Sequence, residues 1–372
     1  MKVIAFYLPQ FHAIPENDKW WGKGFTEWVN VKKAKALFPN HYQPRVPLND
    51  NYYNLLNPEV MKWQVELANK YGVYGFCFYH YWFSGKKLLE KPVEDFLTRK
   101  DLDTHFCLCW ANESWTNTWA NGSADIIMQQ SYGGKIEWKQ HFTYLLNYFN
   151  DDRYIKNDNK PLLIIYRPEL IDCLEEMLSY WEDLARENGF DGIEYAYQNV
   201  SYYLSNKRND NLFKYAIEYQ PNWALALKNI SSLQRMKKAF LLFIEKNFNI
   251  NLREKLQVLS KLKSLDYVSL WNYILDTKPY TNYSVPCAFT DWDNTPRKGK
   301  RGLVVLNANP VDFEKFFLKL LHKAKEEYKQ EMVFVFAWNE WAEGGYLEPD
   351  EKYGYGYLQA IKNSLAKLGD NK

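Results

Sequence analysis

The chain has 372 residues, of which 47% are hydrophobic, and a formal net charge of +2, so it is long and apolar enough for one large folded domain. This near-neutral charge argues against a nucleic-acid partner, because affinity for nucleic acids depends on many cationic side chains. Aromatic residues are unusually frequent, with 15 Trp, 29 Tyr and 22 Phe making up 18% of the chain. Because aromatic rings stack on the apolar faces of sugars, the composition favours a carbohydrate ligand.

The beginning of the chain, Met1–Tyr7, has the pattern of a first strand and lacks the apolar stretch and cleavage site of a signal peptide. No run of about 18 apolar residues occurs, so no membrane-spanning helix is expected. The five cysteines are odd in number, and Cys77, Cys107 and Cys287 lie in apolar, strand-like runs. Buried, reduced thiols are typical of cytoplasmic proteins, and this is the compartment that we expect.

Short apolar or aromatic runs alternate with segments of helical periodicity. Eight runs are predicted to be strands: Val3–Tyr7, Gly75–Tyr81, Phe106–Trp110, Leu162–Tyr166, Ile193–Gln198, Tyr215–Glu218, Val285–Phe289 and Val333–Ala337. The helical segments between them include Pro58–Lys70, Ile136–Asn150, Ile171–Glu187 and Asp312–Glu327. This alternation predicts an α/β fold, a single (β/α)8 TIM barrel over residues 1–372. A doubly wound open sheet is the alternative.

Polar and aromatic residues follow nearly every predicted strand. In a barrel these positions meet at one face, where active sites lie, whereas an open sheet would gather them near one switch point. The distribution therefore favours the barrel. The residues that we expect to contact a sugar at this face are Tyr7, His12, His80, Tyr81, Trp82, Trp110, Asn112, Glu113, Arg167, Asn199, Trp292, Asp293, Arg297, Trp338, Asn339 and Trp341.

Two segments exceed a minimal barrel. Residues 17–57 are rich in Asn, Pro and aromatic side chains and predict a long loop after the first strand, and loops of this length tend to be functional. We expect a helical insertion over about 224–275, between the sixth and seventh strands. Its part 224–265 holds nine Lys/Arg and two Glu. We interpret the insertion as a solvated lid, and the alternative is peripheral contact with a membrane surface or another anionic partner.

Two glutamates, Glu340 and Glu343, follow the last predicted strand. Cleavage of a glycosidic bond needs one acid to protonate the leaving oxygen and a second carboxylate to act at the anomeric carbon. Trp338 and Trp341 would exclude water and raise the pKa of one acid, and the Gly-Gly pair that follows would let the backbone approach a ligand. The spacing therefore predicts that Glu340 and Glu343 are catalytic. The alternative is a helix cap followed by a solvated first-turn acid.

Other polar residues leave alternatives open. Glu113, in the segment WANESW, is a rival partner for Glu340, a contact to a sugar hydroxyl or a link to a neighbouring strand. Asp293 and Arg297 either bind sugar hydroxyls or form a buried pair that holds their loop. His80 is either a donor to substrate or a histidine satisfied inside the barrel.

We expect no metal and no cofactor. The six histidines lack the spacing of metal ligands, and Cys107-Leu108-Cys109 has no partner cluster. The chain also lacks a glycine-rich phosphate loop and a dinucleotide-binding fingerprint. The missing phosphate loop argues against a conventional nucleotide-sugar transferase, which has to hold a diphosphate.

Six segments occur in a fixed order along the chain: FYLPQFH, WWGKGFTEW, FCFYHYWF, LCWANESW, WDNTPR and WNEWAEG. In this order they resemble the WbsX-like family, which is similar to glycoside hydrolase family 99, the endo-α-mannosidases and endo-α-mannanases. The resemblance spans about residues 3–360. It implies a (β/α)8 barrel and retaining chemistry on α-mannosyl-type bonds without a metal.

In family 99 the pattern Asn-Glu-Trp-x-Glu-Gly carries both catalytic acids, and here it falls on Glu340 and Glu343. By this resemblance, Glu340 would be the base that deprotonates the sugar 2-hydroxyl, which attacks C1 to give a 1,2-anhydro sugar. Glu343 would protonate the leaving group and then activate water. Ala342 stands where family 99 commonly has histidine, and this departure bears on the sugar contacts.

We therefore expect a retaining, endo-acting glycoside hydrolase or transglycosidase for α-mannosyl-type linkages of a surface polysaccharide or O-antigen glycan. WbsX-like proteins are often called glycosyltransferases and associated with lipopolysaccharide O-antigen assembly. A glycosyltransferase of lipopolysaccharide, O-antigen or capsule biosynthesis is accordingly the second hypothesis, and a non-catalytic glycan-binding barrel is the third.

Overall fold

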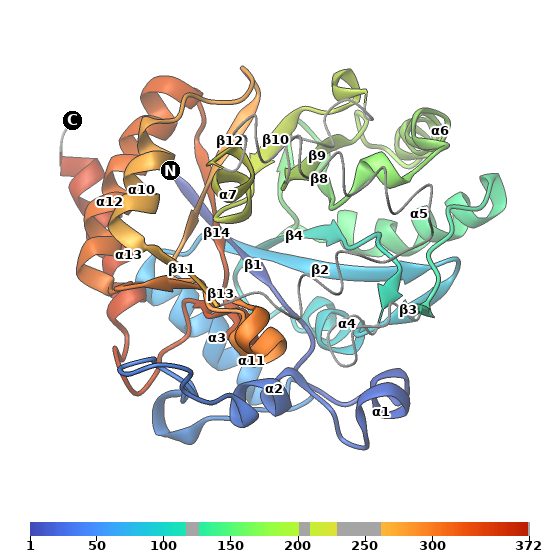
Figure 1. Ribbon diagram of the computed structural model, residues 1–372. Helices are drawn as coiled ribbons and strands as arrows, with labels where there is room; N and C mark the ends of the chain where they lie inside the picture. The colour runs from blue at the N-terminus through green and yellow to red at the C-terminus, as the bar shows by residue number, and fades with distance from the viewer. Residues whose placement is uncertain (117–125, 201–208, 229–261, 371–372) are drawn as a thin grey trace, which may run out of the picture.

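Eight parallel strands form the centre of the protein and helices surround them (Figure 1). The structure, a computed structural model, describes residues 1–116, 126–200, 209–228 and 262–370. The strands are β1 (Lys2–Tyr7), β2 (Gly75–Phe83), β4 (His105–Trp110), β8 (Lys160–Ile165), β9 (Glu194–Asn199), β10 (Tyr215–Glu218), β12 (Ser284–Phe289) and β14 (Met332–Phe336).

The sheet closes on itself. Each of these strands pairs in parallel with the next, and β1 pairs with both β2 and β14. In the closing register, Ile4 lies opposite Gly75 on one side and Phe334 on the other. This closure confirms the predicted (β/α)8 barrel, and each predicted strand is present.

The predicted helices are present to within a few residues of their expected bounds. α3 (Pro58–Tyr71) shows why such boundaries are readable, because Asn57 caps it, Pro58 occupies its first turn and Gly72 ends it in a left-handed conformation. The other long helices around the barrel are α4 (Lys91–Thr98), α5 (Lys135–Phe149), α6 (Leu174–Glu187), α12 (Pro310–Lys323) and α13 (Gly356–Asp370).

The segment between β1 and α3 forms the long loop that the sequence predicts. It contains α1 (Pro15–Trp21) and α2 (Glu27–Lys33), which lie together below the barrel in the view of Figure 1. The loop is tied to the chain after β14, because the Leu48 N–H donates to the Pro349 carbonyl at 3.0 Å. Residues far apart in sequence are thereby joined at one end of the barrel.

Most of the expected helical insertion, residues 229–261, lies outside the described residues. Its two ends are described, and the second end is not purely helical. After α7 (Asn222–Lys228) come β11 (Lys263–Asp266) and α10 (Tyr267–Asp276), and β11 pairs in parallel with β13 (Leu303–Leu306). A strand of four residues is too short to show a strand period in the sequence, so β11 is recognised only from its pairing with β13 in the structure.

α10 is joined to the barrel wall by an aromatic stack. The Trp271 ring is fully buried, and its centroid lies 5.3 Å from that of Phe289 in β12 and 5.7 Å from that of Phe316 in α12. The ring is nearly parallel to both neighbours. This helix therefore belongs to the barrel wall rather than to a separate lid.

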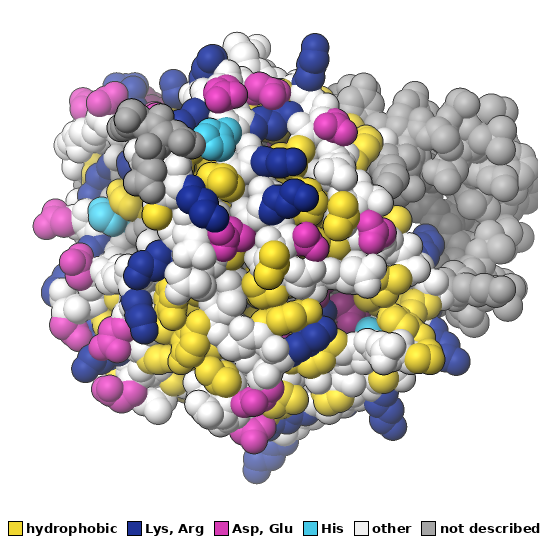
Figure 2. All heavy atoms as spheres, turned by 90° about the vertical axis from the view of Figure 1, so that its left-hand side faces the viewer, with side chains coloured by type: hydrophobic (Ala, Val, Ile, Leu, Met, Phe, Trp, Pro, Cys, Tyr) yellow, Lys and Arg dark blue, Asp and Glu magenta, His cyan; other side chains and the backbone are white. Residues whose placement is uncertain are grey.

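The outer face formed by α10, α12 and α13 carries charges of both signs. Figure 2 shows this side, with Lys and Arg side chains interspersed with Asp and Glu. Lys367 and Glu314 form one such pair across α12 and α13. The described part of this face thus has no single-sign field for an anionic partner. Within the described ranges, no helix combines the length and the apolar character needed to cross a membrane.

We predict that Trp271→Ala lowers the free energy of unfolding by about 3–5 kcal/mol, because it removes the stacked ring and leaves a cavity. Guanidinium unfolding followed by circular dichroism measures the change. The matched control is Trp20→Ala, since Trp20 is 38% exposed and its loss should change stability by less than about 0.5 kcal/mol. Equal effects of the two substitutions would contradict the assigned role of the stack.

Candidate active site

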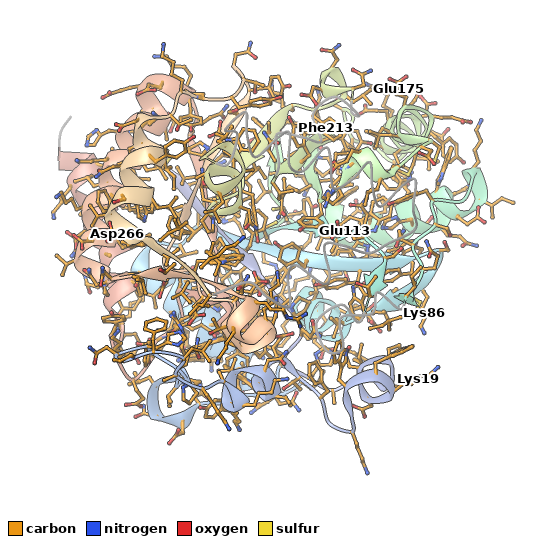
Figure 3. The ribbon with its side chains drawn as sticks, viewed as in Figure 1. Lys19, Lys86, Glu113, Glu175, Phe213 and Asp266 are labelled. Atoms are coloured by element: carbon orange, nitrogen blue, oxygen red, sulfur yellow. The ribbon has the colours of Figure 1, made fainter. Side chains whose placement is uncertain are left out.

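A cavity of about 570 Å³ opens at the C-terminal ends of the barrel strands. Its wall includes residues that follow β1, β4, β8, β10, β12 and β14, together with residues of α1 and α2. One wall residue, Glu113, lies toward the middle of the view in Figure 3, whereas Lys19, Lys86 and Glu175 lie at the edge of the molecule. The cavity is therefore where a barrel of this kind carries its active site.

Tyrosine rings form part of the cavity wall. Tyr79 and Tyr81 of β2 both face the barrel interior, because alternate residues of a strand point to the same side. The Tyr79 hydroxyl lies 3.1 Å from that of Tyr219, and the Tyr166 ring meets Tyr79 edge-on. Burial raises the pKa of Tyr79 and Tyr219 well above the ordinary value, so both stay neutral. The wall thus offers apolar ring faces and neutral hydroxyls, which suit a sugar.

A short hairpin after β14 carries the two predicted acids. β15 (Asn339–Glu340) pairs with β16 (Gly345–Tyr346) in antiparallel register, and a 3-10 turn, η7 (Trp341–Glu343), connects them. Glu340 and Glu343 both line the cavity, with side-chain exposures of 8% and 19%. The structure thus brings the two acids to one space, and their catalytic role stays a prediction.

The two glycines of this hairpin serve close packing. Gly344 has a φ of +74°, and a Cβ there would lie 2.8 Å from the Asp293 nitrogen. A Cβ on Gly345 would lie 2.2 Å from the Phe336 ring. The expectation that this pair approaches a ligand is therefore corrected, because the protein itself fills the space next to both residues.

Arg297 connects the two acids. It lies on α11 (Thr295–Lys298), and its Nη1 is 2.7 Å from Glu343 Oε1 while its Nη2 is 3.4 Å from Glu340 Oε2. A third carboxylate, Glu27 of α2, lies 3.1 Å from Nη2. Burial lowers the pKa of Arg297, but the three carboxylates outweigh this and raise it above its ordinary value. The guanidinium therefore stays charged and holds three acids together.

Burial raises the pKa of Glu340 to about 8, and the nearby Glu343 and Glu27 add to this rise while Arg297 opposes it. Near neutral pH the acid pair of Glu340 and Glu343 consequently retains one proton. A group that exchanges its proton close to the working pH is well placed for acid–base chemistry.

Behind the hairpin, the buried carboxylate of Glu348 holds the two flanking indoles. It accepts hydrogen bonds from Trp338 Nε1 at 3.1 Å and Trp341 Nε1 at 2.6 Å. It also accepts from the Tyr53 hydroxyl at 2.9 Å and Gln64 Nε2 at 2.6 Å. Burial raises the pKa of Glu348 to about 7 although all four donors oppose the rise. The two tryptophans thus support the hairpin from behind and are not part of the cavity wall.

Asn339 and Asp293 are also structural supports rather than wall residues. The Asn339 amide accepts from the Leu8 N–H at 2.8 Å and donates to the Leu8 carbonyl at 3.0 Å, which joins the hairpin to the end of β1. The Asp293 carboxylate accepts from Gln43 Nε2 at 2.6 Å, and its backbone N–H donates to the Glu343 carbonyl at 2.7 Å. Asp293 therefore fixes the backbone of an acid.

Four expected sugar contacts lie on the outer side of the strands instead. The Tyr7 hydroxyl donates to Gln64, and His80 Nε2 lies 2.9 Å from His141 Nε2 in α5. Trp82 stacks on the same histidine, and Trp110 meets it edge-on. His80 and Trp82 alternate with Tyr79 and Tyr81 in β2, so they face the helices. Tyr7 and Trp110 are in register with Phe78 and His80 of that strand and face the same way.

The remaining expected contacts differ in their positions. Asn112 is buried, and its amide donates to the Arg167 carbonyl and accepts from the Arg167 N–H, each at 2.8 Å. Glu113 does line the cavity, where its Oε1 lies 2.5 Å from Arg167 Nη1. His12 and Asn199 are buried and are not part of the wall.

The cavity wall combines predicted and unpredicted residues. Of the predicted contacts and acids, it contains Tyr81, Glu113, Trp292, Arg297, Glu340 and Glu343. Sequence reasoning missed Glu27, Tyr79, Trp115, Tyr166 and Tyr219, which also line it. Strand parity with Tyr81 could have found Tyr79, and the long loop with its GFTEW segment pointed to Glu27. No signal in the sequence indicates that Trp115, Tyr166 and Tyr219 line the cavity, because only the order of the strands around the barrel brings them there.

The charged groups of the wall are mostly acidic. Four glutamates line it, and of its cations Lys33 and Lys298 are exposed while Arg297 is engaged by carboxylates. The described residues contain no group of three or more His, Cys, Asp or Glu side chains that could hold a metal ion. This wall is better matched to an uncharged ligand than to a diphosphate.

A family model described as Glycosyltransferase WbsX matches residues 3–361. Two relatives, both called uncharacterized protein WxcX, come from Xanthomonas campestris pv. campestris strains ATCC 33913 and B100. They are 35% and 34% identical to this chain over 99% of its length. The chain spans about half the length of these curated relatives, since it covers 50% of each.

Solved structures show the same fold. The GH99 endo-alpha-mannosidase from Bacteroides thetaiotaomicron aligns with 99% of this chain and 97% of its own, with a TM-score of 0.56 and 12% identity. A glycoside hydrolase-like protein aligns with 98% of this chain and 93% of its own, with a TM-score of 0.56 and 13% identity. At such identities the likeness establishes the architecture.

We predict that Glu348→Gln destabilises the protein by about 2–4 kcal/mol, because the amide group cannot accept from all four buried donors and leaves at least one unpaired. Thermal unfolding measures the loss, and near-ultraviolet circular dichroism reports the altered setting of Trp338 and Trp341. Glu351→Gln is the matched control, since Glu351 is an exposed glutamate three residues further on. A Glu348→Gln variant as stable as this control would refute the supporting role.

Proposed function

The chain belongs to the Glycosyltransferase WbsX family, and we propose that it is a retaining glycoside hydrolase or transglycosidase that acts on α-mannosyl-type linkages of a glycan. The observation that carries this proposal is the placement of Glu340 and Glu343 on one hairpin, facing one tyrosine-lined cavity and joined by Arg297. Two acids with a shared cation supply the proton donor and the base that glycosidic cleavage requires.

The pair reacts in the form in which its one proton lies on Glu343 and Glu340 is ionised. In the first step, Glu340 takes the proton of the sugar 2-hydroxyl, and O2 attacks C1. The bond from C1 to the leaving oxygen breaks, its electron pair goes to that oxygen, and Glu343 supplies the proton. The products are a 1,2-anhydro sugar and a free hydroxyl on the leaving group. Glu343, with the more exposed side chain of the two, suits the proton exchange with the leaving group and water.

In the second step, water attacks C1 and gives its proton to Glu343. The C1–O2 bond breaks, and O2 recovers the proton held by Glu340. Two inversions at C1 give net retention, and a sugar hydroxyl in place of water gives transglycosylation. Arg297 contacts both carboxylates. Its positive charge therefore stabilises the single negative charge of the pair, whichever of the two acids holds the proton.

The second candidate function is a glycosyltransferase, which the family description favours. A transferase that uses a nucleotide sugar has to bind a diphosphate, and the cavity wall carries four glutamates. An oligosaccharide donor, which carries no phosphate, avoids this conflict. As substrate we therefore propose a surface polysaccharide or O-antigen glycan, processed by cleavage or transfer.

For the compartment we propose the cytoplasm. The five cysteines, all within the described residues, are free thiols, and four of them are buried. This pattern is typical of proteins in a reducing environment.

We predict that Glu340→Gln and Glu343→Gln each reduce turnover of α-mannosyl oligosaccharides by about 10²–10⁴-fold, because each removes a proton-transfer group while preserving the side-chain shape. Product formation by chromatography measures the loss, and thermal unfolding checks the fold. Glu169→Gln is the matched control, since this glutamate pairs with Arg167 and is not part of the cavity wall.

Three outcomes would count against the proposal in different ways. Full activity in both glutamine variants would remove the hydrolase mechanism. Release of nucleotide from a nucleotide sugar in the presence of an acceptor glycan would establish the transferase instead. Binding of α-mannosides without any cleavage or transfer would leave a glycan-binding barrel.

We predict that kcat/KM falls about tenfold per pH unit above pH 8. The pair of Glu340 and Glu343 needs one proton to protonate the leaving group. Burial raises the pKa of Glu340 to about 8, so above this pH the pair loses its last proton. A pH–rate profile with a fixed substrate tests this. Constant activity up to pH 10 would show that the pair does not supply the proton.

A further inference from the structure

Glu27 is a third carboxylate on the same buried arginine, and the hydrolase mechanism above does not use it. Its side chain is only 4% exposed, and it lines the cavity. We propose that Glu27 is a positioning residue of this site, which holds Arg297 against both acids and thereby controls how strongly the acid pair retains its proton. As far as catalysis is concerned, this inference rests on the proposed function.

The guanidinium of Arg297 is held from several sides. Glu27 Oε2 lies 3.2 Å from Nε and 3.1 Å from Nη2, whereas Glu343 contacts Nη1 and Glu340 contacts Nη2. Glu27 therefore binds the edge of the guanidinium that Glu343 leaves open, and it shares Nη2 with Glu340. Without Glu27 the Nε edge would lose this acceptor and the side chain could turn within the cavity.

The local fold also fixes the position of Glu27. Glu27 is the first residue of α2, and its backbone N–H donates to the Gln10 carbonyl at 3.2 Å just after β1. The amide of Asn30, one turn further along α2, lies 3.4 Å from Glu27 Oε2. The three carboxylates consequently reach one guanidinium from two distant parts of the chain, α2 and the hairpin that contains β15 and η7.

The charge count explains why Glu27 would affect the proton. Three ionised carboxylates around one guanidinium would leave a net charge of −2 in a poorly solvated space, which is costly. A proton kept by the acid pair reduces this charge. When Glu27 loses its charge, the remaining cation stabilises the ionised pair more strongly, and the pair gives up its proton at lower pH.

The other groups around Glu340 do not compete for this role. Besides Arg297, Glu343 and Glu27, it is faced by Tyr79 and Tyr81 of β2 and by Tyr219 after β10, while Tyr81 also faces Glu27. Burial raises the pKa of all three tyrosines, which stay neutral over the relevant pH range. Lys33 and Lys298 line the same cavity but are exposed to solvent.

A thermal titration tests the inference without any substrate. The melting temperature of the wild-type protein and of Glu340→Gln is measured from pH 4 to 10. An acid whose folded pKa is raised loses stability as pH rises from its unfolded value to its folded value. With rising pH the melting temperature of the wild type should therefore fall relative to that of Glu340→Gln. The difference between the two melting temperatures should stop changing near pH 8.

The same comparison in a Glu27→Gln background isolates the effect of the third acid. Glutamine keeps the shape and one oxygen for Arg297 but removes the charge. In this background the difference in melting temperature caused by Glu340→Gln should stop changing at a pH lower by on the order of one unit than in the wild-type background. If it stops changing at the same pH in both backgrounds, the proposal is overturned.

Activity profiles give a second reading. In Glu27→Gln the alkaline decline of kcat/KM should move to lower pH by the same amount. Glu16→Gln is the matched control: Glu16 lies in the same loop, pairs with the exposed Lys86 and is not part of the cavity wall, so its profile should match that of the wild type. A Glu27→Gln profile superimposed on the control would overturn the proposal.

Two results are kept apart from these. If Glu27→Gln does not fold, Glu27→Asp serves instead, because it keeps the charge near Arg297. In the Glu27→Asp background the melting-temperature difference should stop changing at the same pH as in the wild-type background, and a lower pH would overturn the proposal.

If the wild type cleaves no glycan, the proposed function fails, while the thermal titration still decides whether Glu27 controls the proton of the pair.

Discussion

The buried guanidinium of Arg297 is the feature on which the candidate site depends. A charge in a poorly solvated space is stable only when oppositely charged groups surround it. Here three glutamates do so, one from α2 and two from the hairpin after β14. In turn, these acids can lie so close together only because the cation stands between them. The long loop after β1, the loop after β12 and the hairpin after β14 are thus joined by one set of ion pairs.

A layer of polar contacts behind the acids makes their position precise. Glu348 holds two indoles, Asn339 joins the hairpin to the end of β1, and the Asp293 N–H holds the backbone of Glu343. Each of these groups is buried and paired, so movement of the hairpin would leave donors or acceptors unsatisfied. Reaction geometry in such a site is set by residues that do not touch the ligand.

Aromatic residues, the most conspicuous feature of the composition, have two different uses. Tyr79 and Tyr81 line the cavity, whereas His80 and Trp82, between and beside them, pack against α5 on the outer side of the barrel. The same short segment thereby serves ligand binding and core packing by simple alternation. An aromatic-rich sequence is consequently only a partial guide to the extent of a sugar site.

Local patterns in the sequence were sufficient for the eight strands, the long helices and the two acids after the last strand, because strand and helix periods, caps and strand ends are properties of neighbouring residues. They could not separate Trp338 and Trp341, which support the hairpin, from residues of the cavity wall, since burial behind a loop and burial beside a ligand select the same side chains. They also gave no sign that Glu27 would meet Arg297, 270 residues away. Closure of the barrel brings such distant loops together, so only the tertiary structure decided which charges became neighbours.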